Sequence, residues 1–95
     1  FNVLASADRY KRRNIEPLLQ RLPRRRFVLV GDSGQRDPEV FGDLARRFPR
    51  QVRRIFIRDV GRSSVARYDA AFAGLDRRSW RVFTDPGALP RNLNE

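Results

Sequence analysis

The sequence predicts an α/β protein built on a parallel sheet. Two short apolar runs rich in β-branched residues, at 26–31 and 52–60, predict buried strands. Amphipathic segments with helical spacing precede and follow them. Strands that alternate with helices every twenty to thirty residues or so are typical of βα units, with right-handed crossovers between parallel strands.

The first helix is expected over residues 14–22. Its apolar residues recur at the spacing of one helix face, at Ile15, Leu18, Leu19 and Leu22. With Asn14 as the N-cap, Pro17 falls in the first turn, where its missing N–H has no intrahelical partner to lose. Pro23 ends this helix.

A strand covered on both faces is expected at 26–31, followed by the polar loop 32–37. Asp37 is suited to cap the next helix, with Pro38 as its first residue. The apolar face of that helix consists of Val40, Phe41, Leu44, Ala45 and Phe48. Pro49 ends it.

The second strand is expected over 52–60, and a helix follows over 63–75. The apolar face of this helix consists of Val65, Tyr68, Phe72 and Leu75. A third, short strand is expected from Trp80 to Phe83. Ligands of such sheets bind beyond the carboxyl ends of the strands, so a site is expected near Asp32 and Asp59.

Composition restricts the chemistry further. The 95 residues suffice for one small domain, and 21 Lys+Arg against 11 Asp+Glu give a net charge of 21 − 11 = +10. Because the chain has neither Cys nor His, zinc sites, thiol nucleophiles and His-based acid/base schemes are excluded within it. Catalysis must use carboxylates, Lys, Arg, Ser or Tyr.

The location and completeness of the chain are also expectations. No apolar run reaches the roughly 18–20 residues of a membrane span, and the first residues lack the layout of a signal peptide, so a cytoplasmic protein is expected. The chain begins with Phe1 rather than Met, which favours a fragment of a longer protein.

The loop after the first strand contains the candidate metal ligands. Asp32 and Asp37 are five residues apart across a glycine-containing turn, and two hard carboxylate ligands suit Mg²⁺. Ser33 and Gly34 add backbone N–H groups that can face an anion. The alternative is that Asp32 starts a turn and Asp37 caps a helix, without sharing an ion.

Lys11 is the single lysine among 20 arginines. A GC-rich coding sequence explains such a bias towards Arg, so a retained Lys suggests a site that needs a compact point charge. Lys11 precedes the helix that leads into the first strand, and from there its ammonium group can balance the charge of a phosphoryl group. The alternative is an ordinary exposed lysine.

Three segments together resemble one family. They are KRRNIEPLL at 11–19, FVLVGDSGQRDPEVF at 27–41 and IFIRDV at 55–60. They look like the catalytic domain of the actin-patch-protein type of phosphatidate phosphatase, within the haloacid dehalogenase superfamily. The resemblance is close over 11–60 and looser elsewhere, and the combination GDSGQxDPE with IFIRDV is far more specific than a lone GD pair.

This resemblance implies a Rossmann-like, three-layer parallel sheet of the haloacid dehalogenase type, of which residues 1–95 form the C-terminal part. It also implies a Mg²⁺-dependent hydrolase that removes phosphate from phosphatidate and leaves diacylglycerol. By motif position, Asp32 and Asp37 would help to hold Mg²⁺ and Lys11 would steady the phosphorylated intermediate. Ser33, Gly34 and Arg58 lie in matching segments without a defined role, and Arg58 is either a phosphate or headgroup contact or a plain surface arginine.

The sequence departs from the family pattern at the nucleophile. Phosphatases of this superfamily attack with the first aspartate of a DxDx[TV] motif. No aspartate in this chain has a second aspartate two positions later. Two explanations follow, a segment of a longer phosphatase or a relative that binds without catalysis, and by the family mechanism these 95 residues alone should not turn over a phosphate ester.

The arginine-rich composition permits other functions. The runs at 24–26, 46–47 and 53–54 suit contact with an anionic membrane or nucleic acid, although they also suit solvent-facing helix and strand ends. Nucleic acid is disfavoured, because no recognised binding motif is present and the phenylalanines fall at core positions. A soluble phosphomonoester is the closest alternative substrate, and peripheral contact with an anionic membrane is compatible with phosphatidate.

Overall fold

The computed structural model describes residues 2–5, 14–61 and 63–84. In chain order, the described elements are β1 (Asn2–Ala5), α2 (Ile15–Arg21), β2 (Phe27–Asp32), α3 (Asp37–Arg47), β3 (Val52–Arg58), α4 (Val65–Ala71), the 3₁₀ helix η1 (Arg77–Ser79) and β4 (Trp80–Phe83). Each helix described lies between two strands in the chain, as the alternating pattern predicts.

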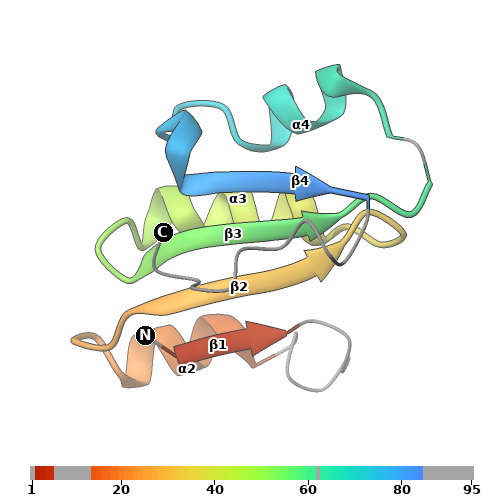
Figure 1. Cartoon of the computed structure of the whole chain (residues 1–95). Helices are drawn as coiled ribbons and strands as arrows, with labels where there is room; N and C mark the ends of the chain where they lie inside the picture. The colour runs from red at the N-terminus through yellow and green to blue at the C-terminus, as the bar shows by residue number, and fades with distance from the viewer. Residues whose placement is uncertain (1, 6–13, 62, 85–95) are drawn as a thin grey trace.

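The described strands form one parallel sheet in the order β1-β2-β3-β4 (Figure 1). The register places Asp32 of β2 beside Arg58 of β3, and Arg58 beside Phe83 of β4. These three strands therefore end at the same level. We call this side of the sheet, with the loops that follow Asp32 and Arg58, the carboxyl edge.

The main core lies on one face of the sheet. Strand residues with the same orientation, such as Phe27, Leu29, Ile55 and Ile57, are buried against the helices. The helices contribute Ile15, Leu19, Phe41, Leu44, Ala45, Tyr68 and Ala71. Gln51 ties α2 to the start of β3, because its side-chain amide donates to the carbonyls of Leu19 and Leu22 at 2.9 Å each. The α/β class and the Rossmann-like parallel sheet are confirmed, and the described residues form two of the three expected layers.

The opposite face of the sheet is also apolar. Val28, Phe56 and Phe83 form a second buried cluster, against which Val30 packs. Both faces of β2 are thus apolar, which explains why its sequence is a continuous apolar run rather than an alternating one. Among the described residues, no helix is long and apolar enough to cross a membrane.

Three local features differ from the sequence prediction. Residues 2–5 form β1, to which no strand had been assigned. Helix α4 is shorter than the predicted 63–75, because it begins after the Ser64 cap and the chain turns at Gly74, whose φ of 82° is in the left-handed region. Val65, expected in the core, is 76% exposed, since it is the first residue of α4 and lies one turn before the buried Tyr68.

Helices α3 and α4 approach each other closely at Gly42. A Cβ atom on Gly42 would lie 1.9 Å from the carbonyl oxygen of Ala71 and 2.9 Å from its carbonyl carbon. Near this contact, the guanidinium group of Arg46 donates to the carbonyls of Ala71 and Ala73, at 2.9 and 3.1 Å. The missing side chain of Gly42 thus lets α4 pack directly on α3.

Candidate functional site

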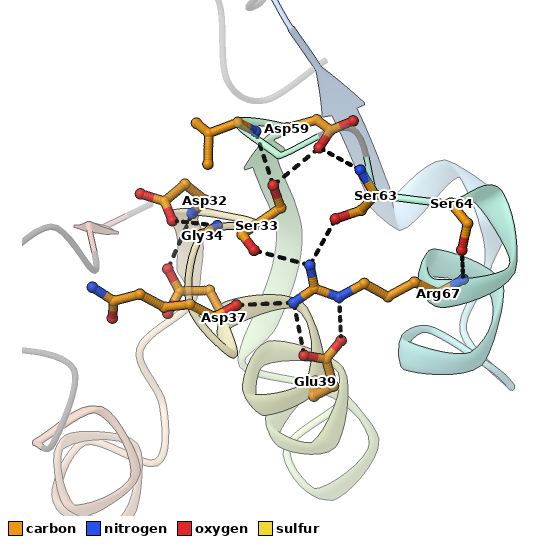
Figure 2. Close-up of polar contacts among 11 residues, drawn as sticks. Asp32, Ser33, Gly34, Asp37, Glu39, Asp59, Ser63, Ser64 and Arg67 are labelled. Atoms are coloured by element: carbon orange, nitrogen blue, oxygen red, sulfur yellow. Dashed lines mark hydrogen bonds and ion pairs between the residues drawn. The ribbon is translucent and has the colours of Figure 1, made fainter.

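The loop after β2 is folded back on itself by its two aspartates (Figure 2). The N–H of Asp32 donates to Oδ2 of Asp37 at 3.0 Å, and the N–H of Gly34 donates to Oδ1 of Asp32 at 2.9 Å. Asp37 is 1% exposed, whereas Asp32 is partly exposed at the carboxyl edge. The structure therefore brings the two predicted metal ligands together in one compact loop.

The start of α3 differs slightly from the prediction. The helix begins at Asp37, with Arg36 in the cap position and Pro38 in the first turn. The first helical hydrogen bond runs from the N–H of Val40 to the carbonyl of Arg36, at 2.9 Å. The carboxylate of Asp37 reaches back across the loop to Asp32, so Asp37 links the loop to the helix.

A second set of hydrogen bonds fixes the loop after β2 to the end of β3. The N–H of Ser33 donates to the carbonyl of Arg58 at 2.9 Å, and the hydroxyl of Ser33 donates to Oδ1 of Asp59 at 3.0 Å. The same hydroxyl accepts from the N–H of Val60 at 2.8 Å, and Oδ1 of Asp59 accepts from the N–H of Ser63 at 3.0 Å. The loops that follow β2 and β3 therefore behave as one hydrogen-bonded unit.

These contacts stabilise the charged form of Asp59. The pKa of Asp59 is lowered from 3.8, chiefly by the N–H of Ser63 and then by the hydroxyl of Ser33, while desolvation opposes the shift. A carboxyl group with a lower pKa in the folded state binds its proton more readily in the unfolded state. Its contribution to stability is therefore present above pH 3.8 and is lost as the pH falls through the folded-state pKa.

This pKa shift predicts a pH-dependent stability difference between the wild type and Asp59→Asn. The difference between their free energies of unfolding should stay constant above about pH 5 and shrink as the pH falls below 3.8. Urea denaturation at several pH values between about 3 and 7 measures it. A difference that does not change with pH would show that the charge of Asp59 contributes nothing to folding.

The remaining predicted site residues stay predictions. The hydroxyl of Ser33 has the two protein partners described above, and the N–H of Gly34 is bound to Asp32. The side chain of Arg58 is exposed, while its backbone joins β2 and β4. Lys11 lies outside the described residues. A contact of Ser33, Gly34 or Arg58 with phosphate and the role of Lys11 are therefore open to experiment.

Sequence reasoning did not find Glu39 and Arg67, although both belong to this site. Glu39 lies in the first turn of α3, and the guanidinium group of Arg67 on α4 pairs with it at 3.0 Å. One signal was available in the sequence: a helix that starts shortly after β3 begins near the carboxyl edge, so its first turn lies near the loop after β2. The charges of Glu39 and Arg67 alone did not distinguish them from other surface residues.

The donor atoms of the loop suit Mg²⁺. Within residues 14–61 and 63–84, no group of three or more His, Cys, Asp or Glu side chains could hold a metal ion. Mg²⁺ is usually held by one or two carboxylates, with water and phosphate oxygens completing its octahedral shell. Two aspartates in one fixed loop, one buried and one partly exposed, fit that requirement, and Asp32 and Asp37 would be the residues that hold the ion.

Comparison with known proteins gives the family. Residues 1–59 match the family described as phosphatidate phosphatase APP1, catalytic domain. The chain belongs to this family. The matched part of the chain includes the whole loop from Asp32 to Asp37 and ends at Asp59, which Ser33 contacts. The family resemblance expected from the sequence is thereby confirmed.

The chain is also similar to two curated proteins. The chain is 38% identical over 56 residues to phosphatidate phosphatase APP1 of Saccharomyces cerevisiae, covering 59% of the chain and 10% of that protein. It is 36% identical over 59 residues to an uncharacterised protein of Schizosaccharomyces pombe, covering 62% of the chain and again 10% of the relative. The matched segment thus spans about a tenth of each relative. No solved structure matches the chain.

Proposed function

We propose that this chain supplies the metal-binding part of a Mg²⁺-dependent phosphatase that converts phosphatidate to diacylglycerol. The observation that carries the proposal is the paired arrangement of Asp32 and Asp37 at the carboxyl edge, in a segment that belongs to the APP1 catalytic family. The relative from S. cerevisiae is itself named a phosphatidate phosphatase. The attacking carboxylate would come from residues outside these 95, because the chain contains no DxD motif.

In this proposal the two aspartates have different roles. Asp37 is buried and accepts from the N–H of Asp32, so its carboxylate would meet a bound ion in a place of low dielectric, where such an interaction is strong. Asp32, partly exposed, would face the side from which a phosphate approaches. A bound Mg²⁺ would supply positive charge that stabilises the oxygens of the transferred phosphoryl group.

Phosphatidate is proposed as the substrate, with a peripheral contact to the membrane that contains it. The net charge of +10 favours an anionic surface. We expect the protein to sediment with vesicles that contain phosphatidate, and to be released as the salt concentration rises, because salt screens exposed charges. Equal binding to neutral vesicles would contradict an electrostatic contact.

The test of the proposed function is phosphate release from dispersed phosphatidate by the natural protein that contains this sequence. Release should require Mg²⁺ and should fall by about 10²-fold or more in Asp32→Asn, since metal stabilisation of phosphoryl charge is worth several kcal/mol and each 1.36 kcal/mol is a factor of ten. Asp43→Asn is the matched control: Asp43 is an exposed residue of α3 that pairs with Arg47 at 3.0 Å.

The outcomes separate the alternatives. Release that the Asp43→Asn variant keeps and the Asp32→Asn variant loses supports the proposal. If phosphatidate is not hydrolysed but a soluble phosphomonoester is, the lipid assignment fails and the phosphatase assignment stands. If neither is hydrolysed with Mg²⁺ present, the proposed function is wrong.

A further inference from the structure

Arg67 of α4 uses every N–H of its guanidinium group to donate a hydrogen bond within the protein (Figure 2). Nε and Nη2 donate to the two carboxylate oxygens of Glu39, at 3.1 and 3.0 Å. Nη1 donates to the carbonyl of Ser33 at 2.9 Å and to the hydroxyl of Ser63 at 2.8 Å. Nη2 also donates to the carbonyl of Gln35 at 2.9 Å. An arginine has five N–H donors, and these five bonds use all of them.

The partners of Arg67 lie within the candidate metal loop and beside it. Ser33 and Gln35 lie between Asp32 and Asp37 in the chain, so the hydrogen bonds to their carbonyls hold the backbone that joins the two aspartates. Glu39 lies two residues after Asp37, in the first turn of α3. Arg67 therefore fixes the loop from its middle and from its far end.

This arrangement makes Arg67 a structural partner of the loop rather than a ligand of phosphate. Every donor is engaged by the protein, so none is free for a substrate oxygen. The bidentate pair with Glu39 is also partly shielded from solvent, because the side chains of Arg67 and Glu39 are 28% and 33% exposed.

We propose that Arg67 is a positioning residue that holds the loop in its metal-binding conformation and thereby sets the affinity for Mg²⁺. The Mg²⁺ part of this inference rests on the proposed function. Arg67 lies beyond the segment matched to the family, which ends at residue 59. Arg67 thus acts in the site from α4, a helix that would contribute no metal ligand of its own.

The physical reason is the entropy of ordering the loop. A loop that is already ordered loses little freedom when it binds an ion, whereas a loose loop must be ordered by the ion itself. Partners that orient metal ligands typically contribute about 10–100-fold to metal affinity. At saturating Mg²⁺ the ion would order the loop, so the rate of the chemical step should be restored.

The experiment compares Arg67→Ala and Arg67→Lys with the wild type in the natural protein. We expect the Mg²⁺ concentration for half-maximal activity to rise about tenfold or more, while kcat at saturating Mg²⁺ stays within about twofold. Lysine should not rescue the affinity, because its ammonium group cannot form the planar fork with Glu39 and also reach both loop carbonyls. Calorimetric titration with Mg²⁺ in the absence of substrate gives the affinity directly.

Arg46→Ala is the matched control. Arg46 also ties α3 to α4, by donating to two carbonyls of the segment 71–73, but it does not contact the loop. Arg46→Ala should lower stability without changing the affinity for Mg²⁺. If Arg46→Ala and Arg67→Ala shift the affinity equally, or if neither shifts it, the inference is wrong.

Hydrogen exchange separates this inference from the proposed function. In Mg²⁺-free protein, the N–H groups of Asp32 and Gly34 should exchange faster in Arg67→Ala than in Arg46→Ala, because their hydrogen bonds depend on the loop path. Equal exchange overturns the positioning role whether or not the protein binds Mg²⁺. If the wild type binds no Mg²⁺ but the loop exchanges faster in Arg67→Ala, the proposed function is wrong. Arg67 is then still the residue that orders the loop.

If Arg67→Ala does not fold, Glu39→Gln should shift the affinity for Mg²⁺ in the same direction by a smaller factor.

Discussion

If Asp37 holds Mg²⁺ as proposed, Asp37→Asn is expected to lower Mg²⁺-dependent phosphate release by about 10²–10³-fold, because it removes the charge of this buried side chain. Asparagine has the same shape, and its side-chain oxygen can still accept from the N–H of Asp32 as the carboxylate does at 3.0 Å. The substitution therefore changes charge while preserving the hydrogen bond. Initial rates at several Mg²⁺ concentrations measure the effect.

A comparison with Asp37→Ala separates the contribution of the charge of Asp37 from that of its hydrogen bond. Alanine removes both the charge and the acceptor, and leaves the N–H of Asp32 without its partner in a partly buried place. That loss should cost about 1–3 kcal/mol of stability in addition to the loss of activity. If Asp37→Asn keeps the activity of the wild type, Asp37 is not a metal ligand.

Gly42→Ala is expected to cause a large loss of stability, greater than that of the same substitution at Gly34 or Gly61. The added Cβ would overlap the carbonyl of Ala71, which belongs to the backbone of α4 and cannot move as a side chain can. Overpacking of this kind typically costs about 1–3 kcal/mol, and the backbone contact places Gly42→Ala at the upper end of that range. Urea denaturation of the natural protein measures the loss.

Gly61→Ala serves as its control. A Cβ at Gly61 meets nothing within 4 Å, so the free energy of unfolding of this variant should be close to that of the wild type. Equal stability of Gly42→Ala and the wild type would mean that the carbonyl of Ala71 does not lie against Gly42 and that α3 and α4 pack less closely.

The sequence predicted the central strands and the helix faces because burial imposes a regular pattern on them. The continuous apolar run of β2 and the spacing of Phe41 and Leu44 on α3 follow directly from what each element buries. The pattern failed where an element is short or ends early. β1 has four residues, too few to show a period, and the exposure of Val65 depends on where α4 begins.

The candidate site was predictable where its residues are close in the chain or follow the ends of predicted strands. Asp32 and Asp37 are five residues apart, so their proximity follows from a single turn. Arg67 contacts Ser33 across 34 residues, and this contact depends on the packing of α4 against α3. Nothing in the local sequence of Arg67 distinguishes it from the other arginines of a chain that contains 20 of them.

The most direct test of the proposed metal site is Mn²⁺ binding followed by electron paramagnetic resonance, with Mn²⁺ as a probe for Mg²⁺. The wild-type natural protein and its double variant Asp32→Asn, Asp37→Asn are titrated in the absence of substrate. We predict that the wild type binds one more Mn²⁺ ion than the double variant, and that added Mg²⁺ displaces this ion. If both proteins bind the same number of Mn²⁺ ions with the same affinity, the loop at the carboxyl edge is not the metal site.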